Sequence, residues 1–137
     1  LHSLTPDESM PSISIWRTNG MKIFISDLLY PGEPDNLLET MASLKGMSVI
    51  LAPTLQEEAE LPAGNARLEN CESGHLRRQL ITPSLSRRYA RAYAAHFELW
   101  ISACLRRQTV LARVPCKGTL TEALSGEALR QGAVELS

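Results

Sequence analysis

Paired cysteines, long apolar stretches and an excess of either charge are all missing from this sequence. Its three cysteines form no Cys-x-x-Cys pair and have no histidine nearby at zinc-ligand spacing, which fits a reduced setting. No stretch approaches the roughly 18 apolar residues that cross a bilayer, and the N-terminus lacks the charged-then-apolar pattern of a signal peptide. We therefore expect a cytoplasmic chain with no membrane span of its own.

Nucleic-acid and phosphate-binding motifs are missing too. The formal net charge is −1, so nothing draws the chain as a whole to nucleic acid or to an anionic membrane. There is no Gly-rich phosphate loop, no RNA-binding aromatic motif and no helix-turn-helix signature. Hydrophobic residues make up 44% of the 137 residues and aromatic residues only 5%. These figures predict one globular domain with an aliphatic core and no nucleic-acid partner.

Three short apolar runs predict the strands of a parallel sheet. They cover residues 21–29, 47–52 and 109–114. In the first run Ile23, Phe24 and Ile25 are continuous rather than alternating, so we expect this strand to be central and buried on both faces. A helix that begins near Asp35 and stops at Gly46 joins the first two strands, which makes one βαβ unit.

The remaining segments predict helices, a hairpin and an irregular start. Residues 1–20 show no helical period and are expected to be irregular. Residues 66–71 and 76–81 flank a turn and predict a small β-hairpin. Apolar residues three or four apart predict a long amphipathic helix that opens at Pro83 and a terminal helix from Leu120.

Three parallel strands make an incomplete sheet. Both faces of such a sheet need cover, and an apolar strand with an unpaired edge invites pairing with another segment. We therefore expect the missing neighbours on upstream sequence or on a second chain. Because the chain begins at Leu1 rather than Met, the first alternative makes it a fragment of a longer reading frame. Self-association through the exposed sheet edge is the other.

Asp27 is the best candidate for a functional residue. It follows the first strand, and open parallel sheets bind ligands at the carboxyl ends of their strands. Its carboxylate could hold a cation or a partner's cationic group, and Ser26 beside it could donate a hydrogen bond. The equally weighted alternative is that Asp27 only caps the turn into the next helix.

A second candidate surface is basic. Most arginines lie between residues 76 and 107, and among them Arg87, Arg88 and Arg91 are the strongest candidates for partner binding. A solvated helix face is the more ordinary interpretation of this pattern. The functional interpretation is that these arginines form a docking surface for an acidic partner. Binding of such a partner would weaken as the salt concentration rises.

Several segments together resemble a known bacterial family. They are Ile-Phe-Ile-Ser-Asp-Leu-Leu over residues 23–29, Leu-Pro-Ala-Gly-Asn-Ala-Arg-Leu-Glu over 61–69, Glu-Ser-Gly over 72–74, then Tyr89 and Tyr93. In this order they resemble the C-terminal part of the domain of unknown function fifty-eight family, over about residues 20–137. That part is similar to a von Willebrand factor A domain, and the family is associated with MoxR-type AAA+ ATPases.

The resemblance implies a fold, a partner and a partial metal site. Residues 21–137 would be the C-terminal half of a von Willebrand factor A-like domain, an α/β, doubly wound (Rossmann-like) parallel sheet with a small inserted β-hairpin. The chain would be a non-catalytic protein-binding module that works with a MoxR-type AAA+ ATPase in complex assembly or maturation, and upstream sequence could anchor it to a membrane. Of the family's metal-site residues only Asp27 is matched, because the Asp-x-Ser-x-Ser loop is absent. One carboxylate cannot define a tight Mg²⁺ site, so Mg²⁺ is expected only in a complete domain.

An enzyme is the rival class. A carboxylate at a strand end could serve a small magnesium-dependent phosphotransferase or nuclease that uses Asp27. The chain has Leu29 where the haloacid-dehalogenase pattern needs a second aspartate. Ser26 has no candidate base nearby and no elbow of glycines around it. Magnesium-dependent turnover of a phosphate ester that disappears in Asp27→Asn is the observation this alternative requires.

Overall fold

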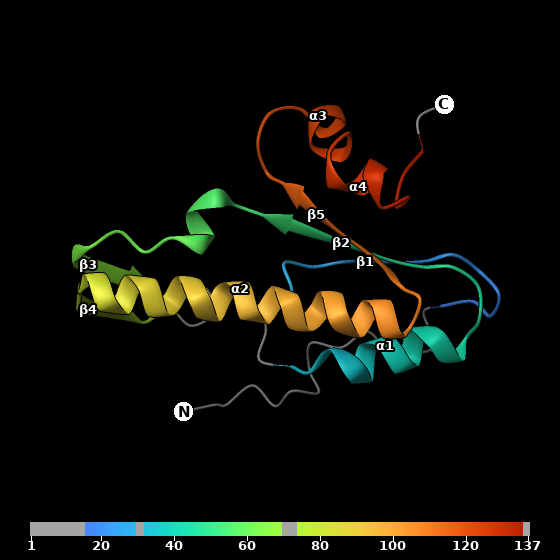
Figure 1. Ribbon diagram of the computed structural model, residues 1–137, viewed down its shortest axis with the longest axis horizontal. Helices are drawn as coiled ribbons and strands as arrows, with labels where there is room; N and C mark the ends of the chain where they lie inside the picture. Colours follow the sequence, from blue (N-terminus) through green and yellow to red (C-terminus); the bar gives the residue numbers. More distant parts are fainter. Residues whose placement is uncertain (1–15, 30–31, 70–73, 136–137) are drawn as a thin grey trace. The chain divides into compact units, whose positions relative to one another are not determined.

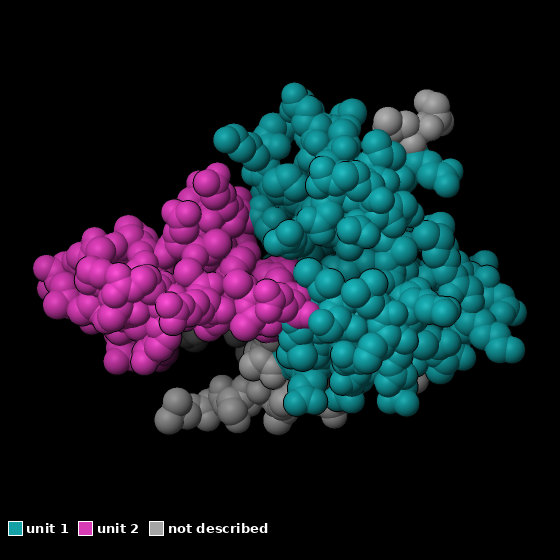
Figure 2. All heavy atoms as spheres, viewed as in Figure 1, with its two compact units in different colours: residues 1–54, 99–137 teal, residues 55–98 magenta. Residues whose placement is uncertain are grey.

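The computed structural model describes residues 16–29, 32–69 and 74–135. Within them the chain forms two compact units (Figure 2). Unit 1 contains the described residues up to 54 and from 99 onward, and unit 2 contains the described residues between 55 and 98. The elements are β1 (Lys22–Ile25), α1 (Pro34–Ser43), β2 (Ser48–Thr54), the 3-10 helix η2 (Gln56–Ala59), β3 (Gly64–Glu69), β4 (Leu76–Ile81), α2 (Pro83–Arg106), β5 (Val110–Pro115), α3 (Leu120–Leu124) and α4 (Glu127–Arg130). The strands and the α-helices are labelled in Figure 1.

Unit 1 contains a parallel sheet in the order β1-β2-β5. Ile23 pairs with Val49, and Val49 in turn pairs with Val110, so residues in register lie on the same face. The central strand β2 is the most buried, with Ile50 and Ala52 fully enclosed. The predicted mixed α/β class and the parallel direction of the three strands are confirmed.

The sequence predicted that β1 is buried on both faces, and this prediction was wrong. β1 lies at the edge of the sheet, and the side chains of Ile23 and Ile25 are 51% and 64% exposed. Only the opposite face is covered, where Lys22 is buried and Phe24 half-buried. A continuous apolar run shows that a strand can be buried on both faces, but it does not show that the neighbours needed for this are present.

Helix α1 begins and ends on local backbone features. Pro34 occupies the first helical position, where its missing N–H costs nothing, and Asp35 follows it in the first turn, so the helix begins where the sequence predicted. The helix buries Leu37, Leu38 and Met41. It ends before Gly46, whose φ is +80° and where a Cβ would lie 2.5 Å from the carbonyl oxygen of Gly20. Only glycine fits this close approach.

Unit 2 contains the predicted hairpin. β3 and β4 pair antiparallel, with Gly64 opposite Ile81 and Glu69 opposite Leu76. The first part of α2, through Glu98, belongs to the same unit. Tyr89 Oη donates to the carbonyl of Glu58 at 2.8 Å, and Ser86 Oγ donates to the carbonyl of Leu61 at 2.7 Å. These two bonds fasten the loop before β3 to the helix.

The last part of α2 and the C-terminal residues belong to unit 1. Trp100, Ala103 and Cys104 are buried in its core. The single terminal helix predicted from Leu120 is instead two short helices, α3 and α4, because the backbone at Gly126 leaves the helical region with ψ −114°. No helix in the described part of the chain is long and apolar enough to span a membrane.

Candidate functional site

Ser26 and Asp27 lie directly after β1, and their side chains bond to the following backbone. Ser26 Oγ accepts the N–H of Leu28, and Asp27 Oδ1 accepts the N–H of Leu29, both at 3.1 Å. Asp27 therefore stabilises its own turn and does not cap α1, whose N-cap is Glu33. The carboxylate is exposed, so it can still meet a cationic group of a partner.

Leu28 explains why this turn needs two side-chain bonds. Its φ of 61° lies in the left-handed region, which costs a leucine about 1–3 kcal/mol. The side chain is fully buried, so hydrophobic burial offsets the strain. The turn thus anchors the end of β1 in the core and leaves Asp27 on the surface.

Among the described residues, none joins Asp27 to form a metal site. In residues 16–29, 32–69 and 74–135 no three histidine, cysteine, aspartate or glutamate side chains are grouped closely enough to hold a metal ion. Mg²⁺ prefers near-octahedral oxygen coordination, which one carboxylate cannot supply. The Mg²⁺ site expected from the family resemblance stays a prediction for a more complete domain.

The outer edge of β1 offers a different kind of site. The N–H of Lys22 donates to the carbonyl oxygen of Met47 at 2.9 Å, and the N–H of Ser26 donates to the carbonyl oxygen of Leu51 at 3.2 Å. Because successive residues of a strand direct their N–H and C=O groups to opposite sides, those of Ile23 and Ile25 face away from β2. No other described strand pairs with this edge. We call Met21, Ile23, Ile25 and the outer backbone of β1 the open edge.

The open edge carries no exposed charge within its strand. Lys22, the one charged residue of β1, is fully buried, and its Nζ donates to the carbonyls of Gly20, at 3.3 Å, and Lys45. Natural sheet edges are usually protected by charged side chains, prolines or bulges. Because that protection is missing from β1, its edge is suited to pairing with another strand.

The arginines predicted as one basic surface fall into two sets. Arg87, Arg88 and Arg91 are exposed on α2 within unit 2. Arg106 and Arg107 belong to unit 1, where the Nη2 atom of each lies 3.9 Å from Oδ1 of Asp35. At this separation, and with exposed side chains, such ion pairs contribute little to stability.

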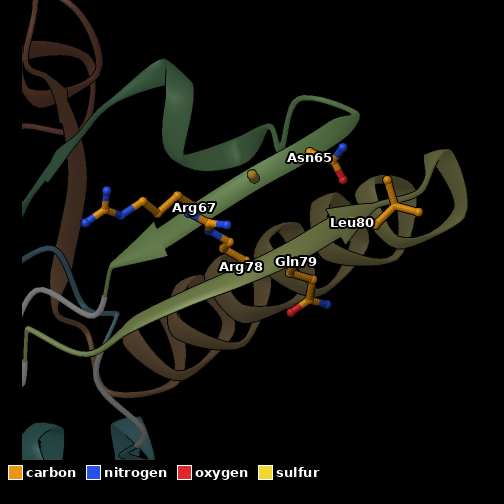
Figure 3. Close-up of a pocket in the computed structure, with 6 residues that line it drawn as sticks. Asn65, Arg67, Arg78, Gln79 and Leu80 are labelled. Atoms are coloured by element: carbon orange, nitrogen blue, oxygen red, sulfur yellow. The ribbon is translucent and has the colours of Figure 1, made fainter.

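One further arginine was missed by the sequence reasoning. Arg67 of β3 lies directly opposite Arg78 of β4 in the hairpin register. Both side chains line an open hollow of about 450 Å³ together with Asn65, Ala66, Gln79 and Leu80 (Figure 3). The hairpin was predicted from the sequence, but its register was not, and only the register brings these two arginines together.

The chain matches no family model, no curated protein and no solved structure. The resemblance to the domain of unknown function fifty-eight family therefore remains a prediction that these comparisons do not bear on.

Proposed function

We propose that this chain is a non-catalytic protein-interaction module with a von Willebrand factor A-like sheet, and that a strand of a protein partner adds to β1. The open edge supports this proposal. It combines outward N–H and C=O groups at Ile23 and Ile25 with exposed apolar side chains. In strand addition, main-chain hydrogen bonds supply affinity and alternate side chains supply specificity.

The carboxyl end of β1 adds a polar contact to this surface. Ser26 and Asp27 continue from the open edge, and the exposed Asp27 carboxylate suits an arginine or lysine of the added segment. The family resemblance supplies the first partner to test, a MoxR-type AAA+ ATPase acting in complex assembly or maturation. A second copy of the chain is the competing occupant of the same edge.

The test measures binding of the full chain to a purified MoxR-type ATPase. Ile25→Lys places a charge on the open edge and should weaken binding at least about tenfold, or about 1.4 kcal/mol. Leu105→Lys is the matched control, because Leu105 is 74% exposed on α2 and lies outside the open edge. Its affinity should equal that of the unchanged protein.

Three results would overturn parts of this proposal. Equal affinity of Ile25→Lys and Leu105→Lys would remove the open edge from the interface. Absence of any binding to the ATPase would remove that partner. Dimerisation of the isolated chain that is abolished by Ile25→Lys, measured by sedimentation velocity, would assign the edge to a second copy instead.

A further inference from the structure

The exposed face of the β3–β4 hairpin carries an unusual pair of like charges. Arg67 and Arg78 lie opposite each other in the antiparallel register and share one face. Figure 3 shows both side chains on the same side of the hairpin, with Arg78 reaching toward the strand that carries Arg67. Like charges directly opposite each other destabilise a strand pair. Neither arginine forms an ion pair with an acid in the described residues.

The residues around this pair define a pattern along the strands. On the face that carries Arg67 and Arg78, the next pair toward one end of the hairpin is Asn65 with Leu80. The next pair toward the other end is Glu69 with Leu76. Leu76 and Leu80 are 50% and 61% exposed. The opposite face carries Ala66, Gln79 and the buried Ile81, so it provides the hairpin's packing. The outward face therefore places a double positive charge between two exposed leucines.

We propose that this face, the arginine-pair face of Asn65, Arg67, Leu76, Arg78 and Leu80, binds an extended acidic peptide segment of a partner protein. A glutamate or aspartate of the peptide lies between the two guanidinium groups, which form forked hydrogen bonds to a carboxylate. Two residues along a strand span about 6.6–6.8 Å. Apolar side chains two positions before and after the acid therefore match the spacing of Leu80 and Leu76.

The composition of the face favours a peptide over nucleic acid. Single-stranded nucleic acid is held by a basic groove along its phosphates and by aromatic side chains beneath its bases. Here there are two cations, the neighbouring pair contains Glu69, and the apolar residues are leucines. A peptide carboxylate flanked by apolar side chains can bind the two arginines and pack on the leucines. The successive phosphates of a nucleic acid would instead be repelled by the Glu69 carboxylate. This surface belongs to unit 2 and does not depend on the proposal for β1.

The test is an NMR titration of the full, isotope-labelled chain with two synthetic peptides at low salt. One peptide is acetyl-Leu-Thr-Glu-Thr-Leu-amide, and the other has glutamine in place of glutamate. We expect the glutamate peptide to bind at least about tenfold more tightly and to shift the amide signals of Arg67 and Arg78. Raising the salt from about 25 mM to about 300 mM should weaken that binding, because these exposed charges are screened.

Variants on the two faces of one strand supply the control. Arg67→Gln/Arg78→Gln should lose the preference for the glutamate peptide. Arg77→Gln should keep it, because Arg77 is an exposed arginine of the same strand whose side chain lies on the other face. Arg78→Glu should also lose peptide binding but melt at a higher temperature than the unchanged protein, since it replaces like charges by opposite ones.

Each contrary result overturns the proposal. Equal affinity for the two peptides would show that the two arginines do not distinguish glutamate from glutamine. Equal losses in Arg77→Gln and in the double variant would show a general charge effect and no site. Tighter binding of oligothymidine than of the glutamate peptide, lost in the same double variant, would reassign the face to nucleic acid.

Discussion

Lys22 shows how one buried charge can organise a turn. Its Nζ donates to the backbone carbonyls of Gly20, which precedes β1, and Lys45, which follows α1. The N–H of Asn19 donates to the carbonyl of Leu44 at 2.8 Å beside them. A buried ammonium needs such partners, because desolvation without hydrogen bonds is costly. The residue that could have protected the sheet edge is thus committed to holding the end of α1 against the start of β1.

Cys104 and Cys116 should differ sharply in reactivity. Burial raises the pKa of the Cys104 thiol from 9.0 to about 12, whereas Cys116 is exposed. Because the thiolate is the reactive form, Cys104 in the folded protein should not react with a disulfide reagent at neutral pH. In a Cys71→Ser background we expect one rapidly modified thiol, and none after Cys116→Ser is added. Rapid modification of Cys104 before unfolding would contradict its burial.

The Cys104 thiol also determines in which direction the stability of the protein changes at alkaline pH. Its folded pKa lies above the unfolded value, so the unfolded chain loses this proton first. The contribution of Cys104 to stability is therefore constant below about pH 9 and falls as the pH rises from 9 toward 12. Cys104→Ala should remove this part of the alkaline loss, measured by urea unfolding at pH 7 and pH 10.

Helix α3 is short and depends on its capping box. Thr119 Oγ1 accepts the N–H of Glu122 at 3.3 Å, and Glu122 Oε2 accepts the N–H of Thr119 at 2.8 Å and its hydroxyl at 2.9 Å. The backbone hydrogen bond from Thr119, followed by the side-chain one, lowers the pKa of the Glu122 carboxyl. Two of the N–H groups at the start of the helix, those of Thr119 and Glu122, are satisfied in this way.

Thr119→Ala should loosen α3 while Thr119→Ser should preserve it. Loss of an N-cap hydroxyl costs about 1 kcal/mol. Because the pKa of Glu122 is depressed in the folded state, its contribution is present above the usual value of 4.5 and lost as the pH falls through the folded pKa. The Thr119 amide signal should therefore move with pH in the acidic range in the unchanged protein, and no longer do so in Glu122→Gln. A Thr119→Ser variant as unstable as Thr119→Ala would argue against the cap.

Most elements could be predicted from apolar patterns, but their neighbours could not. The runs at 21–29, 47–52 and 109–114 became β1, β2 and β5, and the long helix begins at Pro83 as predicted. Burial of β1 was mispredicted because a side-chain pattern does not show whether another element covers each face of the strand. The Arg67–Arg78 pair was missed because hairpin register depends on turn geometry as well as on the pattern. The Thr119–Glu122 box had a sequence signal, Thr-x-x-Glu, that was not used.

At the scale of the whole molecule, apolar burial is unevenly shared between the two units. Most of the buried apolar side chains of the described residues belong to unit 1, including Ile50, Trp100 and Met41. In unit 2 only Ile81 and Phe97 are buried to this degree among the described residues. An isolated two-stranded hairpin is marginally stable in water. The hairpin that carries the arginine-pair face should therefore open more often than the parallel sheet.

Hydrogen exchange of the native protein can test whether the two units open independently. Ile50→Val removes one methylene from the central strand and should cost about 0.5–1.5 kcal/mol. If the β2 amides exchange only through global unfolding, their rates should rise about two- to tenfold. The amides of β3 and β4 should exchange faster than those of β2 in both proteins and keep their rates in the variant, since they open locally. Equal acceleration in the hairpin would show that the chain unfolds as one cooperative body, and the arginine-pair face would then be as rigid as the sheet. With independent opening, binding of an acidic peptide should slow exchange in β3 and β4 and leave β2 unchanged.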